Sequence, residues 1–182
     1  MEVIRREKAL NLPNALTLLR IALLPFVVWR YVQGDIRGAL VIYLLAMLTD
    51  VADGVIARRL NQITALGKLL DPLADKLSLF VLLALFVWNG QVSMLPVQLI
   101  LVKEIILILG SAGALRVGIV VSADPIGKVT TLLFTASMVC RFLSYRALAD
   151  TLLWLSVLLS FSALVWYALA LIKRLKLKIA TA

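Results

Sequence analysis

Long apolar segments alternate with short polar breaks along the chain. The breaks contain glycine, proline, asparagine or clustered charges, which favour turns over a continued helix. Each segment is close to the length of about 20 mostly apolar residues that a helix needs to cross a bilayer. The pattern predicts six helices, at residues 12–33, 36–58, 66–88, 94–116, 126–146 and 151–172. We therefore expect an all-α protein.

Composition places these helices in a membrane. Of the 182 residues, 63% are hydrophobic, and the mean hydropathy is +1.02. A soluble domain is nearer half apolar and spreads its charges over the whole surface. We expect six transmembrane helices in one domain, residues 1–182. Residues 1–10 are strongly charged and lack a small-residue cleavage site, so we expect a short amphipathic helix on the membrane surface and no signal peptide.

Positive charge is concentrated in alternate breaks. The net charge is +9, but the basic residues lie at the ends of apolar segments, whereas a nucleic-acid-binding domain gathers them on one face. We therefore expect no nucleic-acid partner. By the positive-inside rule, both termini and the second and fourth breaks lie on the cytoplasmic side of the cell membrane. This asymmetry is carried by Arg5, Arg6, Lys8, Arg58, Arg59, Lys68, Arg116, Lys128, Lys173, Arg174, Lys176 and Lys178.

Four aspartates gather at the inner ends of the second and third expected helices. Asp50 and Asp53 are three positions apart and Asp71 and Asp75 are four apart, so each pair shares one helix face. An aspartate at a membrane helix centre costs about 2.5 to 3.5 kcal/mol on insertion scales, so this cluster needs a cause. If the short link between the helices returns the chain as an antiparallel pair, the two faces meet and surround one cavity.

The available ligands indicate which ion this cavity would bind. The chain has no histidine, and its single cysteine, Cys140, lies inside an apolar segment. Oxygen ligands alone favour Mg²⁺ or Mn²⁺ over zinc. Four carboxylates suit two ions, which steady the attacking and leaving oxygens of a phosphoryl displacement. The structural alternative is pairing of the aspartates with nearby lysine or arginine.

The residues around the aspartates resemble a known signature. Residues 50–58 read D-V-A-D-G-V-I-A-R, and Gly67, Asp71 and Asp75 follow in fixed register. This pattern is similar, position for position, to that of the CDP-alcohol phosphatidyltransferase family. Residues 11–20, N-L-P-N-A-L-T-L-L-R, and 67–77, G-K-L-L-D-P-L-A-D-K-L, look most like its bacterial phosphatidylglycerophosphate synthase branch.

The resemblance implies a role for each matching residue. A membrane enzyme would transfer the phosphatidyl group of CDP-diacylglycerol to glycerol 3-phosphate, and a homodimer is implied. Asp75 would be the general base, and Arg58 would meet the pyrophosphate. Gly54 and Gly67 would make room for the CDP group, although close helix packing explains small residues equally well. The implied metal ligands are Asp50, Asp53, Asp71 and Asp75, and the implied CDP-lipid site is Asn14, Thr17, Gly54, Ala57, Arg58 and Gly67.

Basic residues in the later helices are candidates for acceptor recognition. An acceptor that carries a phosphate would need several bases, whereas a neutral alcohol would need fewer. Snorkelling to the interface is the alternative, mainly for those near helix ends. Where the branch usually has Arg-Glu this chain has Lys103-Glu104, and a usual Gly-Lys-x-Lys-Thr-x-x-Gln run lacks its second lysine and its glutamine. The candidates are Lys103, Arg116, Lys128 and Arg141.

Two other functions remain compatible with the sequence. The same chemistry could act on another acceptor, such as inositol phosphate. From a different class, a cation transporter or channel could use the aspartates as a permeation site. Transporters usually show two related halves with broken helices, whereas these carboxylates cluster near one end of two adjacent helices.

Overall fold

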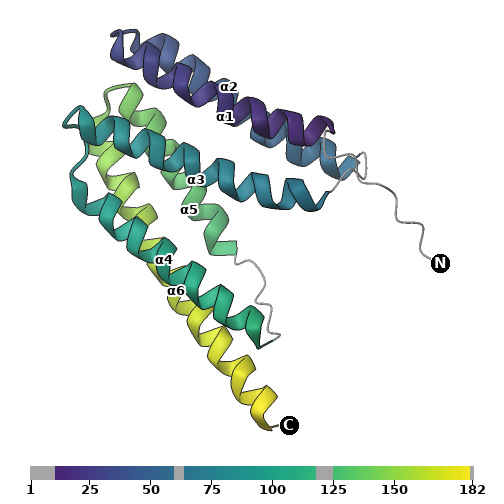
Figure 1. Cartoon of the computed structure of the whole chain (residues 1–182). Helices are drawn as coiled ribbons and strands as arrows, with labels where there is room; N and C mark the ends of the chain where they lie inside the picture. Colours follow the sequence, from purple (N-terminus) through teal and green to yellow (C-terminus); the bar gives the residue numbers. More distant parts are fainter. Residues whose placement is uncertain (1–10, 60–63, 118–124, 181–182) are drawn as a thin grey trace. The chain divides into compact units, whose positions relative to one another are not determined.

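The computed structural model describes residues 11–59, 64–117 and 125–180, and these ranges form six helices and no strands (Figure 1). The expected all-α class is confirmed. The amphipathic helix expected in residues 1–10 lies outside the described residues. The helices are α1 (Leu12–Val32), α2 (Ile36–Arg59), α3 (Ala65–Trp88), α4 (Met94–Arg116), α5 (Pro125–Phe142) and α6 (Arg146–Ala180).

The boundary between α5 and α6 differs from the one expected. The sequence predicts a break up to Asp150, but α5 ends at Phe142 and α6 already begins at Arg146. Ser144 adopts the left-handed conformation, with φ of 66°, so a very short link turns the chain. The residues that follow favour helix, so α6 starts at once.

Within the residues described, three helices are long and apolar enough to cross a membrane: α1 at Leu12–Val32, α4 at Met94–Ala114 and α6 at Arg146–Leu175. The aspartates of the sequence signature lie in the other helices α2 and α3 and add charge to both. The chain is therefore a helical membrane protein.

The chain divides into two compact units, Met1–Trp88 and Asn89–Ala182. In the first unit, α1 packs against both α2 and α3, and Figure 1 shows α1 and α2 side by side along most of their lengths. Ala39, Tyr43 and Ala46 recur at helical spacing on the buried face of α2, and the two alanines allow a close approach. Tyr31 of α1 meets Phe86 of α3 edge to face, with ring centroids 5.6 Å apart.

Local capping fixes where the first three helices begin. The Asn11 side chain accepts a hydrogen bond from the backbone N–H of Asn14 at 2.9 Å, which caps α1. Asp35 accepts from the N–H of Gly38 at 2.9 Å at the start of α2. Thr64 accepts from the N–H of Gly67 at 3.0 Å at the start of α3. Such caps satisfy backbone donors that have no partner inside the helix.

In the second unit, α6 packs against α4 and α5. The buried core joins Phe134 and Met138 of α5 to Leu153 and Val157 of α6. The Ser137 hydroxyl donates to the backbone oxygen of Ala149 at 2.7 Å, which ties the end of α5 to the start of α6.

Candidate active site on α1, α2 and α3

A buried polar face on α1 organises the candidate site. Asn14, Thr17 and Arg20 follow one another at three-residue spacing, so they lie on one side of the helix. Their exposed fractions are 1%, 0% and 0%. Buried polar groups need hydrogen-bond partners, and a buried charge needs them most. We define these three residues as the α1 polar face.

Each member of this face has a partner on α3 or at its N-terminus. The Asn14 side-chain amide donates to Thr64 Oγ1 at 3.1 Å, and the Thr17 hydroxyl donates to Asp71 Oδ1 at 3.0 Å. Nη1 of Arg20 donates to Oδ1 of Asp75 at 2.7 Å. Residue numbers rise together along both helices in these pairs, so α1 and α3 run parallel.

Arg20 also contacts α2. Its second terminal nitrogen, Nη2, forms an ion pair with Oδ1 of Asp50. Asp50 and Asp75 side chains are 43% and 54% exposed, whereas the Arg20 side chain is fully buried. One guanidinium group therefore joins carboxylates from two helices, and both carboxylates keep a face open to the surroundings.

Gly67 lies where the polar face begins. The Thr64 hydroxyl accepts a hydrogen bond from the Gly67 N–H at 3.0 Å and so caps α3. A Cβ on Gly67 would lie 2.7 Å from Asn14 Oδ1 and 3.2 Å from Thr64 Oγ1. This favours close packing of α1 on α3 as the reason for glycine here. That Gly67 also makes room for the CDP group is a separate proposal.

We expect Gly67→Ala to lower the melting temperature of the purified protein by several degrees, because the new methyl group displaces the Asn14 amide from its hydrogen bond. Gly113→Ala is the matched control. It changes a glycine in α4 that has no atom within 4 Å of the added Cβ. Melting measured in detergent should leave this control near wild type, and equal shifts in both variants would contradict the packing role.

The structure brings together many of the predicted site residues. Asp50, Asp71 and Asp75 meet the α1 polar face, which itself includes Asn14 and Thr17. The spacing of the aspartates predicts that α2 and α3 bring the carboxylates together as a pair. In the structure α1 is the common partner that links them. The side chains of Asp53, Ala57 and Arg58 and the surroundings of Gly54 lie outside what the structure describes.

Sequence reasoning missed Arg20 as a site residue. The signal was available, because Arg20 is a charged residue in the middle of the apolar α1 segment, and intramembrane charges indicate function. The signature itself does not point to α1, because the spacing of the aspartates predicts only that α2 and α3 face each other.

The donor chemistry of the site fits a hard divalent cation. Asp50, Asp71 and Asp75 offer carboxylate oxygens and, with Arg20, leave two negative charges in excess. Among the side chains that the structure describes, no three acidic or cysteine groups are close enough to hold one ion. Asp53, the fourth predicted ligand, is not among them. These side chains therefore have the chemistry of ligands for a divalent cation. That they surround a bound ion is a proposal.

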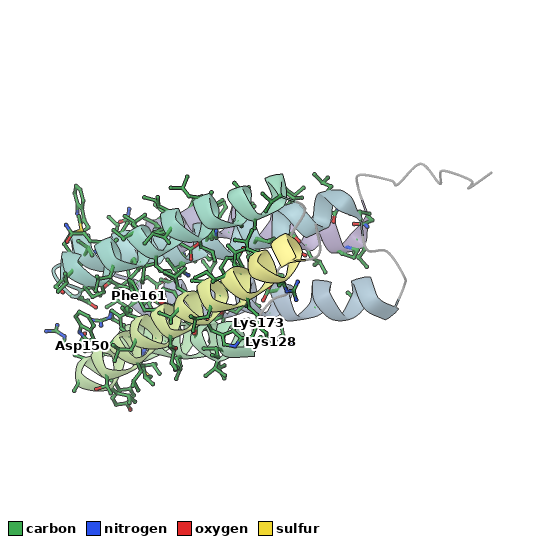
Figure 2. The ribbon with its side chains drawn as sticks, turned by 90° about the horizontal axis from the view of Figure 1, so that it is seen from below. Lys128, Asp150, Phe161 and Lys173 are labelled. Carbon is green, nitrogen blue, oxygen red and sulfur yellow. The ribbon has the colours of Figure 1, made fainter. Side chains whose placement is uncertain are left out.

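The acceptor candidates lie in the second unit, and two of those whose side chains are described, Lys128 and Arg141, lie far apart on α5. Lys128 is exposed in the first turn of α5. Arg141 is buried near the other end of α5, where it pairs with Asp150 at 2.5 Å and donates to the backbone oxygen of Gln91. Lys128 and Arg141 are thirteen positions apart in sequence, which corresponds to about 20 Å of helix. Figure 2 shows Asp150 toward one end of α6 and Lys173 toward the other.

The remaining two candidates differ in what can be said of them. Lys103 and Glu104 are neighbours on α4, are largely buried, and pair at 2.5 Å. Such a pair neutralises the lysine charge within an apolar helix. The side chain of Arg116 lies outside the described residues. Within the part of the chain described, Lys128 is the candidate best exposed to meet an acceptor.

Comparison with known proteins identifies the family of this chain. The family model of CDP-alcohol phosphatidyltransferase matches residues 10–175. A CDP-diacylglycerol–glycerol-3-phosphate 3-phosphatidyltransferase of Aquifex aeolicus is 34% identical over 131 residues, 71% of this chain and 74% of the relative. One of Rickettsia bellii is 41% identical over 98 residues, 52% of this chain and 54% of the relative.

A relative named for a different reaction is almost as similar. A cardiolipin synthase (CMP-forming) of Streptomyces coelicolor is 33% identical over 119 residues, 62% of this chain and 55% of the relative. The chain thus spans about half the length of two of these three relatives. The family match includes α1 to α5, most of α6 and all four aspartates of the signature. The chain belongs to the CDP-alcohol phosphatidyltransferase family, and it is a transferase.

Proposed function

We propose that this protein transfers the phosphatidyl group of CDP-diacylglycerol to sn-glycerol 3-phosphate, which gives phosphatidylglycerophosphate and CMP in phospholipid biosynthesis. The observation that carries the proposal is the meeting of Asp50, Asp71 and Asp75 with the α1 polar face, in a chain whose relatives include enzymes named for this reaction. A permeation site for a transported cation would not need the matching family signature.

The reaction is a displacement at phosphorus. The acceptor hydroxyl attacks the phosphorus on the lipid side of the pyrophosphate, its proton passes to Asp75, and the bond to CMP breaks. Asp75 suits the role of base because its side chain is 54% exposed while Arg20 orients it. Arg58 would meet the pyrophosphate, and Asn14, Thr17, Gly54, Ala57 and Gly67 would line the CDP-lipid site.

We propose Mg²⁺ or Mn²⁺ as the cofactor, in two sites held by Asp50, Asp53, Asp71 and Asp75. The bound ions would neutralise charge on the pyrophosphate and on the leaving CMP. Thr17 holds Asp71 by one oxygen and Arg20 holds Asp50 and Asp75, so the described carboxylates are already oriented before an ion arrives. This ordering lowers the entropic cost of assembling the site.

We also propose the membrane arrangement that the charge pattern favours. All six helices would cross the cell membrane, residues 1–10 would lie on its surface, and both termini and the active site would face the cytoplasm. The α1 polar face lies in the first half of α1, Asp50 in the second half of α2, and Asp71 in the first half of α3, so alternating spans put them on one side. A homodimer is proposed from the family resemblance.

A lipid alcohol is a second candidate class of acceptor. The cardiolipin synthase relative is nearly as similar as the glycerol-phosphate enzymes, so a lipid hydroxyl could replace a small phosphorylated alcohol. The paired Lys103 and the buried Arg141 also leave fewer exposed bases for a phosphate than the sequence predicts.

A panel of acceptors decides between these classes. Purified protein would be given CDP-diacylglycerol and Mg²⁺ with glycerol 3-phosphate, inositol phosphate, inositol, serine or phosphatidylglycerol, and CMP release would be measured. The proposal predicts that glycerol 3-phosphate gives the highest kcat/KM. A higher value for phosphatidylglycerol or inositol phosphate would replace the acceptor and leave the family unchanged.

We expect Lys128→Gln to raise the KM for glycerol 3-phosphate by about tenfold or more, because loss of one charge-assisted hydrogen bond to a phosphate costs on the order of 1.5 to 3 kcal/mol. The KM for CDP-diacylglycerol should change little. Lys173→Gln, at an exposed lysine of α6, is the control. Equal changes in both KM values would remove Lys128 from the acceptor site.

In Arg141→Gln, a fall in melting temperature at unchanged KM would assign that residue to the ion pair with Asp150.

A further inference from the structure

Arg20 is a fully buried charged residue, and it reaches two other helices. Its two terminal nitrogens are divided between partners, Nη2 on Asp50 of α2 and Nη1 on Asp75 of α3. The partners are the carboxylates assigned above to metal binding and to proton transfer. Their separation is therefore set by the width of a single guanidinium group.

We propose that Arg20 is a positioning residue for phosphatidyl transfer, which fixes the distance and orientation between the Asp50 and Asp75 carboxylates. The proposal rests on the transfer reaction proposed above and adds a residue outside the aspartate signature. Arg20 lies beneath the two carboxylates, fully buried, while they are 43% and 54% exposed. It acts through them and does not itself face the exposed side.

The shape of the side chain makes this role specific to arginine. A guanidinium is a rigid planar fork whose separate nitrogens can each hold one carboxylate, whereas a lysine ammonium is a single point of charge on a flexible stem. Lys at position 20 would retain the charge and lose the fixed spacing. Arg20→Lys therefore separates geometry from net charge.

Electrostatics explains why such a link is needed. Two carboxylates from different helices repel each other, and in a site of low dielectric constant this repulsion is strong. Arg20 cancels part of it and holds both groups from the same side. Thr17 holds Asp71 one turn earlier on the same face, so α1 positions Asp50, Asp71 and Asp75, the signature carboxylates whose side chains are described.

A purely structural role is the competing explanation, because removing one member of a buried ion pair destabilises a fold. The test therefore needs a quantity that stability alone does not change. The variants are Arg20→Lys and Arg20→Gln. The control is Arg30→Gln on the same helix, where Arg30 forms an exposed ion pair with Asp35 at 3.1 Å.

Three quantities would be measured on each folded, purified variant: kcat with KM for CDP-diacylglycerol, Mn²⁺ affinity by electron paramagnetic resonance, and melting temperature in chelator. For Arg20→Lys we expect kcat to fall by about 100-fold or more while KM for CDP-diacylglycerol changes by less than about threefold. Mn²⁺ binding should weaken by about tenfold, because the charge is retained and only the ligand geometry is lost. Arg30→Gln should match wild type in all three.

The outcomes are distinct. Wild-type kcat and Mn²⁺ affinity in Arg20→Lys would overturn the positioning role, as would failure of both Arg20 variants to fold while Arg30→Gln folds. If wild-type protein released no CMP, the proposed function would fail. The Mn²⁺ titrations of wild type and Arg20→Lys would still report whether Arg20 sets the carboxylate geometry.

Discussion

Replacing Asp71 by asparagine is expected to lower kcat by about 10³-fold or more, equivalent to about 4 kcal/mol of transition-state stabilisation. Asparagine keeps the shape of aspartate and an oxygen that can still accept the Thr17 hydroxyl, now 3.0 Å from Asp71 Oδ1. It removes the negative charge that a divalent cation requires. The protein should therefore insert and fold, and turnover should fail.

The control for this variant is Asp35→Asn. Asp35 caps α2 through the Gly38 N–H and pairs with Arg30 at the surface, and asparagine caps helices about as well as aspartate. Its kcat should stay near wild type. Excess chelator should abolish the activity of wild-type protein, and Mg²⁺ or Mn²⁺ should restore it. Near-normal turnover in Asp71→Asn, or full activity in chelator, would contradict the metal proposal.

Asp75→Asn and Asp50→Asn should lose comparable turnover for different reasons. If Asp75 is mainly the base, its amide variant should lower kcat by about 10² to 10⁴-fold and retain most of the Mn²⁺ affinity. Asp50→Asn should lower both kcat and Mn²⁺ affinity, because a metal ligand is lost. Each variant also weakens one arm of the Arg20 link, so the comparison is between two variants that share this effect.

Metal titration of the two folded variants distinguishes these roles. Electron paramagnetic resonance of Mn²⁺ gives the affinity, and single-turnover CMP release gives the chemical step. Equal loss of Mn²⁺ affinity in the two variants would make Asp75 chiefly a ligand. Normal single-turnover rates in Asp75→Asn would remove it from proton transfer.

The helices were predictable because their apolar segments have the length that a membrane span requires. Four of the six agree with the expected bounds within one residue. The α5–α6 boundary was not predictable, because the turn depends on the left-handed conformation of Ser144. Residues other than glycine rarely adopt this conformation. Glycine at 34, with φ of 82°, was easier to recognise as a turn because glycine favours this conformation.

The candidate site was predictable in its residues and only partly in its construction. Spacing along a helix places two carboxylates on one face, so both aspartate pairs could be found from the sequence. The role of α1 in joining them could not be found in this way, because the packing of α1 against both α2 and α3 is a tertiary property. The predicted association of Lys128 with Arg141 depended on charge alone, and the ion pair of Arg141 with Asp150 needed the fold.

The most direct test of the account is product analysis with protein in lipid nanodiscs. Labelled CDP-diacylglycerol and glycerol 3-phosphate would be supplied with Mg²⁺, and CMP and phosphatidylglycerophosphate would be measured together. The account predicts that the two products appear in equal amounts, and that neither forms without the acceptor or in the Asp71→Asn variant. CMP release without a phosphatidyl product, or no release with any acceptor alcohol, would contradict a phosphatidyltransferase.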